Sequence, residues 1–201
     1  MDAADLLTRL RLLSQARPGP GILQLPPELS GADAVRVVRA ALKALEPRPA
    51  HPAKTGERGG IVRAHIDGAA RGNPGPAGVG VLIIGPDGQV VERVHRYIGE
   101  ATNNVAEYRA LLLALERAHA LGYAALEICS DSELLVRQLQ GRYRVKHPTL
   151  LKLYAMARDR LEGFRHFDIR HVPREQNAEA DALANRALDE AYRSMRRGEG
   201  D

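Results

Sequence analysis

Between residues 61 and 98, apolar and polar residues alternate in three short runs that predict β-strands. The runs are "IVRAHID", which ends at Asp67, "VGVLII" and "QVVERVHRYI". The glycine-rich stretch "GAARGNPGPAG" is expected to be a turn between the first two, and "GPDG" a turn between the last two. Runs bounded by Gly, Pro and Asp are typical of strands joined by turns. The pattern therefore predicts an antiparallel meander.

After residue 102 the periodicity becomes helical and alternates with two further strands. A helix is predicted from residue 103 to about residue 121, where Gly122 would end it. "ALEICS" and "HFDIRHV" are typical of strands, and helices are expected in "SELLVRQLQ", "PTLLKLYAMARDRLEGF" and "NAEADALANRALDEAYRSM". This order predicts an α/β fold with a five-stranded mixed sheet, three antiparallel strands then two parallel ones, flanked by helices.

The first 58 residues follow a different pattern. Apolar stripes predict two helices within residues 1–46, and residues 47–59 have the Pro/Gly-rich composition of a linker. We therefore expect a helical N-terminal segment of unknown role, a linker, a main domain over residues 60–192 and a polar tail over residues 193–201. Whether the helical segment packs on the main domain or on a protein partner stays open.

Composition narrows the class of protein. Hydrophobic residues make up 44% of the chain and charged residues 27%, as in globular proteins, and no apolar run is long enough to cross a membrane. The single cysteine, Cys129, cannot form an intrachain disulfide, which fits a reducing compartment. We therefore expect a cytoplasmic protein without a membrane partner. Residues 142–165 are rich in Lys and Arg, which can attract phosphates, although a solvated helix face is the simpler explanation.

Four acidic residues lie near the ends of predicted elements, and each has an ordinary structural explanation. Asp67 could belong to a turn, and Asp131 could cap the helix that follows it. Glu107 could close a capping box that begins at Asn104. Asp181 could complement the dipole of the last helix.

Their joint placement indicates a metal site instead. Asp67 and Asp131 would lie side by side if the fourth strand pairs with the first, at the strand ends where ligands gather in such sheets. Glu107 and Asp181 lie near helix N-termini that would face the same rim. Four acids would repel one another unless a cation lay between them, and hard divalent ions prefer carboxylate oxygens. Two such ions about 4 Å apart are the usual device for phosphodiester cleavage.

Four segments of the chain resemble, in order, the four sequence blocks of type 1 ribonuclease H. They are "HIDGAARGNPGPAGVGVLI", "TNNVAEYRALLLAL", "ICSDSELLVRQL" and "NAEADALANRAL". The resemblance covers roughly residues 61–188. It implies the ribonuclease H-like fold and an endonuclease that cuts the RNA strand of RNA–DNA hybrids. It also implies two Mg²⁺ ions per site, with Mn²⁺ as an alternative, and products with 5′-phosphate and 3′-hydroxyl ends.

The resemblance also assigns roles to residues. The family's acidic tetrad, which is both catalytic and metal-binding, maps onto Asp67, Glu107, Asp131 and Asp181. Glu107 would contact metal and the RNA 2′-hydroxyl, the group by which proteins distinguish RNA from DNA.

A second set of residues would contact the substrate. By resemblance, Thr102 would hold a DNA phosphate, while Asn103 and Asn104 would approach minor-groove edges or sugar hydroxyls. Asn73, in "GNPG", resembles a residue that borders the site. Helix capping explains "TNN" equally well, and a turn explains Asn73, so both alternatives stay open.

The chain also departs from the best-known bacterial members of the family. It has no tryptophan and no long basic insertion, and "GRYRVKHPTL" and "VPREQN" make it similar to the shorter archaeal-type branch. Many relatives carry a mobile histidine that assists product release; depending on the alignment, His171, Arg174 or Glu175 stands there. Two alternatives remain: a non-catalytic duplex-binding protein on the same fold, or a nuclease that also cuts double-stranded RNA.

Overall fold

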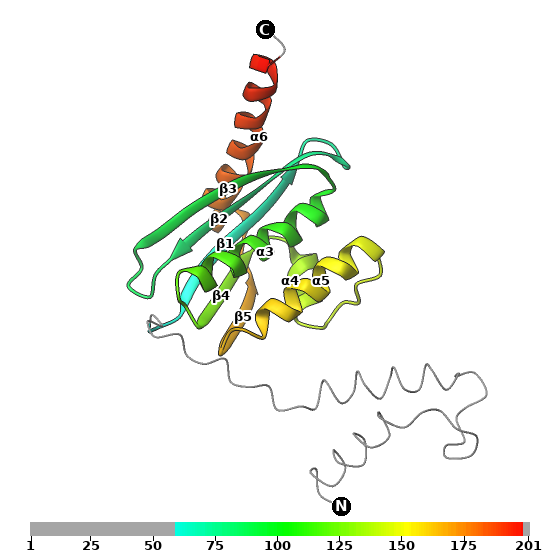
Figure 1. The fold of residues 1–201 in the computed structure, drawn as a ribbon. Helices are drawn as coiled ribbons and strands as arrows, with labels where there is room; N and C mark the ends of the chain where they lie inside the picture. Colours follow the sequence, from blue (N-terminus) through cyan, green and yellow to red (C-terminus); the bar gives the residue numbers. More distant parts are fainter. Residues whose placement is uncertain (1–58, 199–201) are drawn as a thin grey trace, which may run out of the picture. The chain divides into compact units, whose positions relative to one another are not determined.

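The computed structural model describes residues 59–198. The predicted helical segment over residues 1–46 and nearly all of the predicted linker lie outside the described residues. The described chain forms a five-stranded sheet in the order β3-β2-β1-β4-β5, with helices on both faces (Figure 1). In this part of the chain, no helix is both long and apolar enough to span a membrane.

The strand directions confirm the predicted mixed sheet. The strands are β1 (Val62–Ala70), β2 (Gly75–Ile84), β3 (Val90–Ala101), β4 (Ala125–Ser130) and β5 (His166–His171). β1 pairs with β2 in the antiparallel sense and with β4 in the parallel sense, so strand direction changes across β1. β3 extends the antiparallel half and β5 the parallel half.

The helices lie where the periodicity predicts them. They are α3 (Asn103–Ala120), α4 (Glu133–Leu139), α5 (Pro148–Leu161), the short 3₁₀ helix η1 (Arg174–Gln176) and α6 (Ala178–Gly198). α3 and α6 lie on opposite faces of the sheet (Figure 1). Because β2 is covered on both faces, residues 77–83 are buried in one long run, whereas the buried apolar residues of β1, Val62, Ala64 and Ile66, alternate with more exposed ones. α6 continues past residue 192, where the sequence predicts the polar tail to begin.

The first strand is longer than predicted, which changes the setting of Asp67. β1 does not end at Asp67 but continues to Ala70, which pairs with Ala77 of β2. The glycine-rich stretch is therefore mostly strand. Two of its glycines are explained by helix packing: a Cβ on Gly68 would lie 2.2 Å from a backbone atom of Ala106 in α3, and one on Gly78 would lie 2.5 Å from the backbone oxygen of Ala184 in α6. A long-range contact of this kind has no local signature in the sequence.

The close approach of α3 to β1 makes Gly68 sensitive to substitution. We expect Gly68→Ala to lower the free energy of unfolding by about 3 kcal/mol, the upper end of the usual effect of overpacking, because the added methyl meets backbone rather than a movable side chain. Urea unfolding followed by circular dichroism would measure the change. Gly59→Ala is the matched control, because no atom lies within 4 Å of its added Cβ. Equal midpoints for the two variants would show that α3 does not rest on Gly68.

Candidate active site

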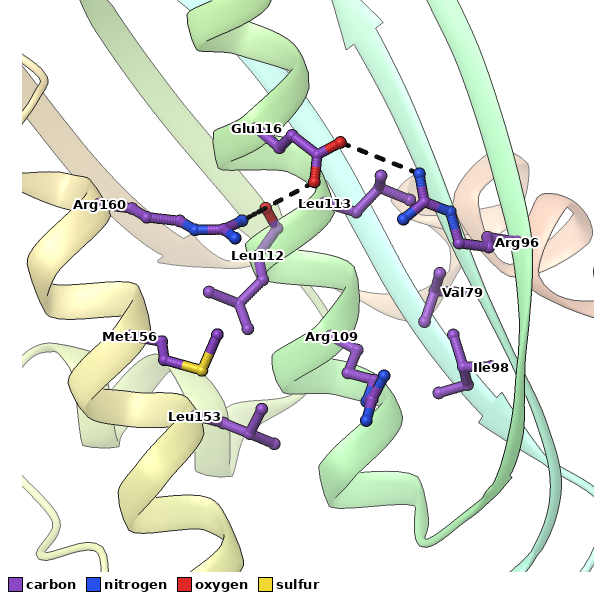
Figure 2. Close-up of a pocket in the computed structure, with 10 residues that line it drawn as sticks. All are labelled: Val79, Arg96, Ile98, Arg109, Leu112, Leu113, Glu116, Leu153, Met156 and Arg160. Carbon is purple, nitrogen blue, oxygen red and sulfur yellow. Dashed lines mark hydrogen bonds and ion pairs between the residues drawn. The ribbon is translucent and has the colours of Figure 1, made fainter.

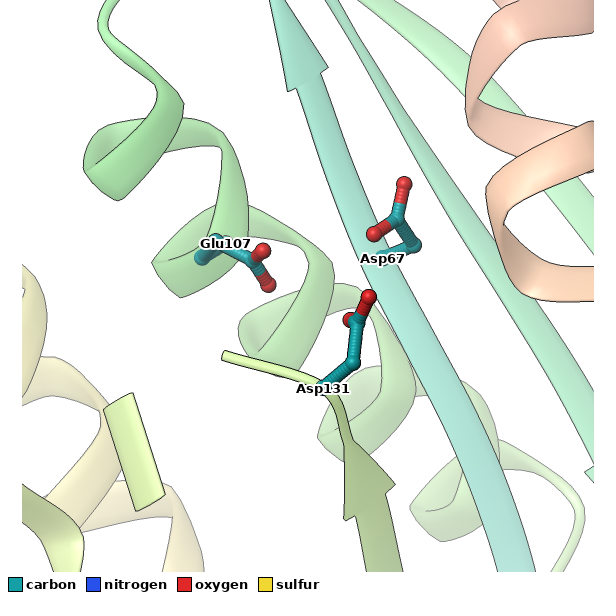
Figure 3. A group of neighbouring side chains, drawn as sticks. All are labelled: Asp67, Glu107 and Asp131. Carbon is teal, nitrogen blue, oxygen red and sulfur yellow. The ribbon is translucent and has the colours of Figure 1, made fainter. Parts of the chain in front are cut away.

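Three of the four predicted acids meet beside β1, at the C-terminal end of β4. Asp67, Glu107 and Asp131 each offer a carboxylate oxygen, and these oxygens lie within 4.8 Å of one another (Figure 3). Ile66 is in register with Ser130 in the parallel β1–β4 pair, so the residues that follow them, Asp67 and Asp131, are neighbours. The sheet topology therefore brings together acids that are far apart in the sequence.

Glu107 reaches this cluster from α3. The N-cap of α3 is Thr102, whose hydroxyl accepts a hydrogen bond from the backbone N–H of Val105 at 3.3 Å. The capping-box explanation for Glu107 and Asn104 is therefore wrong, because the helix begins earlier and Glu107 lies beyond its first residues. The Oε2 atom of Glu107 is buried and has no hydrogen-bond partner. A buried carboxylate oxygen without a partner is costly, and a bound cation would satisfy it.

Asp131 is likewise not a helix cap. The N-cap of α4 is Ser132, whose side chain accepts from the backbone N–H of Leu135 at 3.5 Å. The carboxylate of Asp131 instead accepts a hydrogen bond from Nδ2 of Asn177 at 3.0 Å. The same carboxylate group contributes an oxygen to the acid cluster.

The electrostatics of the cluster favour a cation. Asp67 is only 6% exposed, and burial, followed by the charges of Asp131 and Asp181, raises its pKa from 3.8 to about 7. Burial and the charges of Asp67 and Asp131 also raise the pKa of Glu107 well above its ordinary value. Three ionised carboxylates so close together require a positive charge, and their oxygens are the ligands that hard divalent ions prefer. The donor set therefore fits such an ion.

Asp181 stands beside the cluster rather than in it. It lies in the first turn of α6, where its carboxylate accepts hydrogen bonds from Arg174 at 3.0 Å and from the side chain of Asn185 at 3.2 Å. Its charge still contributes to the raised pKa of Asp67. The predicted tetrad is therefore three converging acids plus a fourth that Arg174 neutralises.

The residues expected to contact substrate join two neighbouring segments. Oδ1 of Asn103 accepts from the backbone N–H of Ala70 at 2.9 Å, and Oδ1 of Asn73 accepts from the N–H of Asn103 at 3.2 Å. The β1–β2 turn is thereby tied to the start of α3, where Thr102 is the cap. Asn73, Asn103 and Asn104 are exposed. Thr102 thus caps the helix and Asn73 lies in the turn, which are the structural roles proposed as alternatives. The side chain of Asn104 remains exposed to solvent.

The three candidates for product release lie after or at the end of β5. His171 is the last residue of β5, and its Nε2 lies 3.2 Å from the backbone oxygen of Asp131. Arg174 and Glu175 belong to η1, and Arg174 is the partner of Asp181. His171 and Arg174 therefore each contact one of the four predicted acids, Asp131 and Asp181 respectively.

Asn177 is a residue of this site that the sequence patterns did not reveal. It is 1% exposed, and its Nδ2 donates to the backbone oxygen of Ile66 at 2.8 Å as well as to Asp131. An asparagine just before a helix is an ordinary cap in sequence terms, which is why it attracts no attention.

A separate hollow of about 270 Å³ lies between the sheet, α3 and α5 (Figure 2). Its lining residues are Val79, Arg96, Ile98, Arg109, Leu112, Leu113, Glu116, Leu153, Met156 and Arg160. Arg96 and Arg160 each lie 3.9 Å from Glu116, while Arg109 points into the hollow (Figure 2). None of the clustered acids lines this hollow. The candidate active site is therefore the acid cluster beside β1 at the C-terminal end of β4.

The chain is similar to known sequences over most of the described residues. The family model described as "Reverse transcriptase-like" matches residues 65–187. The chain is 49% identical to ribonuclease HI of Halobacterium salinarum over 135 residues, which is 67% of this chain and 68% of that protein. It is 47% identical over 129 residues to a bifunctional protein of Mycobacterium tuberculosis, a match that covers 64% of this chain but only 35% of that protein.

The chain is also similar to solved structures. The crystal structure of RNase H1 from Halobacterium salinarum superposes with a TM-score of 0.64 at 48% identity, covering 65% of this chain and 99% of that one. LC11-RNase H1 in complex with an RNA/DNA hybrid gives a TM-score of 0.60 at 45% identity, with 65% and 99% covered. The sheet order and the acid cluster thus define the ribonuclease H-like class of proteins. The chain belongs to the ribonuclease HI family of hydrolases.

Proposed function

We propose that this protein is an endoribonuclease that hydrolyses the RNA strand of RNA–DNA hybrids at the edge of β1 and β4. The observation that carries the proposal is the convergence of Asp67, Glu107 and Asp131, in a chain similar to ribonuclease HI enzymes. A solved relative, LC11-RNase H1, is in complex with an RNA/DNA hybrid, which supports the choice of substrate. When bound, two Mg²⁺ or Mn²⁺ ions would activate the attacking water and stabilise the leaving oxygen.

The acids hold the cations in this proposal. The negative charges of both Asp131 and Asp181 raise the pKa of Asp67, so a cation here would act on all three acids. Bound cations would keep Asp67 and Glu107 ionised at neutral pH, reversing the effect of burial. Asp181 would be the fourth acid of the site. Because Arg174 pairs with it at 3.0 Å, Arg174 competes with a cation for that carboxylate.

The start of α3 is the proposed substrate side of the site. Thr102, Asn103 and Asn104 stand at the N-terminus of the helix that carries Glu107, and Asn73 is bonded to Asn103. The positive end of the helix dipole favours phosphate, so this end suits the DNA backbone. Glu107, deeper in the same helix, would meet the RNA 2′-hydroxyl, which would restrict cleavage to RNA.

The test is a panel of duplexes carrying a label on one strand. We expect the protein to cut the RNA strand of an RNA–DNA hybrid in Mg²⁺ or Mn²⁺, and to cut neither the DNA strand of that hybrid nor a DNA–DNA duplex. Chelation by EDTA should stop cleavage. Binding of the hybrid without cleavage would contradict the proposal and favour a non-catalytic duplex-binding protein. Equal cleavage of RNA–RNA duplexes would contradict hybrid specificity and favour a broader nuclease.

A further inference from the structure

We propose that Asn177 is a positioning residue that orients the carboxylate of Asp131 for metal binding and ties it to the neighbouring strand. This inference rests on the metal site proposed above. Asn177 is not itself a metal ligand in that proposal. It contacts the three segments that carry Asp67, Asp131 and Asp181.

The side-chain amide of Asn177 joins β1 to the end of β4. Its Nδ2 donates to the backbone oxygen of Ile66, the residue before Asp67, at 2.8 Å. The same nitrogen donates to Oδ1 of Asp131 at 3.0 Å. One NH₂ group therefore fixes the spacing between the two strand positions from which acids enter the cluster.

The chemistry of these contacts requires an amide. A backbone carbonyl and a carboxylate oxygen only accept hydrogen bonds, so the group between them needs two donors. Asparagine supplies both from one nitrogen, while serine supplies one and an ionised aspartate none. Asn177 is 1% exposed, so water cannot readily replace a lost donor. The contacts also fix which way the amide faces.

The backbone of Asn177 extends this connection to the fourth acid. Its carbonyl oxygen accepts the N–H of Asp181 at 3.1 Å, a bond that forms the first turn of α6. Asn177 thus holds Asp131 through its side chain and the start of the Asp181 helix through its main chain. Displacing it would change the relative position of both acids.

A purely structural role makes a different prediction from a positioning role. If Asn177 only stabilises the fold, its replacement lowers the stability of the metal-free protein and leaves metal affinity unchanged. If it orients Asp131, replacement also weakens metal binding, by about 10- to 100-fold as for other groups that orient metal ligands. The two roles separate in a metal titration.

The test compares Asn177→Ser and Asn177→Asp with Gln138→Ala in the full chain. Gln138 is another buried amide, 5% exposed, but its oxygen accepts from Tyr108 at 2.8 Å and it contacts none of the acids in the cluster. Thermal unfolding would be recorded in EDTA and then across a titration of Mn²⁺ or Mg²⁺. We expect both Asn177 variants to need about 10- to 100-fold more metal for the half-maximal rise in Tm. Gln138→Ala should lower Tm without moving that midpoint.

Cleavage kinetics and NMR provide independent readouts. For Asn177→Ser we expect kcat at fixed low metal to fall while KM for the hybrid stays within about twofold. In the wild-type protein, the side-chain NH₂ resonances of Asn177 should shift as metal binds, a readout that is available even if both variants fail to fold. An unchanged metal midpoint in a folded variant, or unchanged NH₂ resonances in the wild type, would overturn the proposal. The absence of any metal-induced rise in wild-type Tm would overturn the metal site itself.

Discussion

Replacing Asp131 by asparagine is expected to slow cleavage of the RNA strand by about 10³-fold or more while the protein still folds and binds the hybrid. Metal ions contribute several kcal/mol of transition-state stabilisation, and about 1.4 kcal/mol corresponds to a tenfold change in rate. Asn has the shape of Asp but lacks the charge of the clustered carboxylate. Single-turnover rates at saturating hybrid would measure the loss, with binding followed separately by fluorescence anisotropy.

The control for this variant is Asp87→Asn. Asp87 lies in the β2–β3 turn, where its side chain accepts from the N–H of Gln89 at 3.0 Å, a bond that an asparagine oxygen can also accept. This variant should cleave at the wild-type rate. If Asp131→Asn cleaved within tenfold of the wild type, the acid cluster would not be the catalytic centre.

Replacing Asp67 by asparagine is expected to stabilise the metal-free protein at neutral and alkaline pH. The folded-state pKa of Asp67 is raised from 3.8 to about 7, so the folded state binds this proton more tightly than the unfolded state. The wild-type free energy of unfolding therefore falls as pH rises from about 4 to about 7 and then levels off. Each pH unit between these two pKa values lowers the free energy of unfolding by about 1.4 kcal/mol. Asp67→Asn should therefore raise the free energy of unfolding at about pH 8 by an amount on the order of 4 kcal/mol.

Urea unfolding in EDTA, at about pH 5 and about pH 8, would test this linkage. The stability gap between Asp67→Asn and wild type should widen toward pH 8. Adding Mg²⁺ at pH 8 should stabilise the wild type and have little effect on the variant, because the variant has lost a ligand. If the free energies of unfolding of the two proteins changed in parallel with pH, the pKa of Asp67 would be the same in the folded and unfolded states, which would contradict this account.

The fold was predictable wherever its signals are local. α3 begins at Asn103 after a threonine cap and ends shortly before a glycine, and β4 is a short run of mostly apolar residues, so their bounds agree with the sequence. The end of β1 was predicted wrongly because Gly68 reads as a turn residue. A glycine is required at position 68 because the backbone of Ala106 in α3, 38 residues further along the chain, leaves no room for a Cβ. Such contacts appear only once the elements are assembled.

The site could be predicted only from the acidic residues taken together, because each of them alone has an ordinary structural explanation. The local explanations for Asp67, Glu107 and Asp131 were wrong, because Asp67 lies within a strand and the caps are Thr102 and Ser132. Their joint placement pointed to the cluster that the structure shows.

Two other features of the site depend on contacts that no spacing reveals. The pairing of Asp181 with Arg174 and the bond from Asn177 to Asp131 each form only when η1 and the start of α6 pack at the edge of the sheet. The cytoplasmic location and the domain boundaries stay predictions, and for the basic residues 142–165 a solvated helix face and attraction of phosphates both stay open.

The most direct test of the central claim is to identify the cleavage products formed in isotopically labelled water. Hydrolysis at the acid cluster predicts that the downstream RNA fragment carries a 5′-phosphate containing one labelled oxygen, and that the upstream fragment ends in an unlabelled 3′-hydroxyl. Mass spectrometry of a single-turnover reaction on an RNA–DNA hybrid would show both. A 2′,3′-cyclic phosphate or a 3′-phosphate would mean attack by the RNA's own 2′-hydroxyl, and would contradict the account.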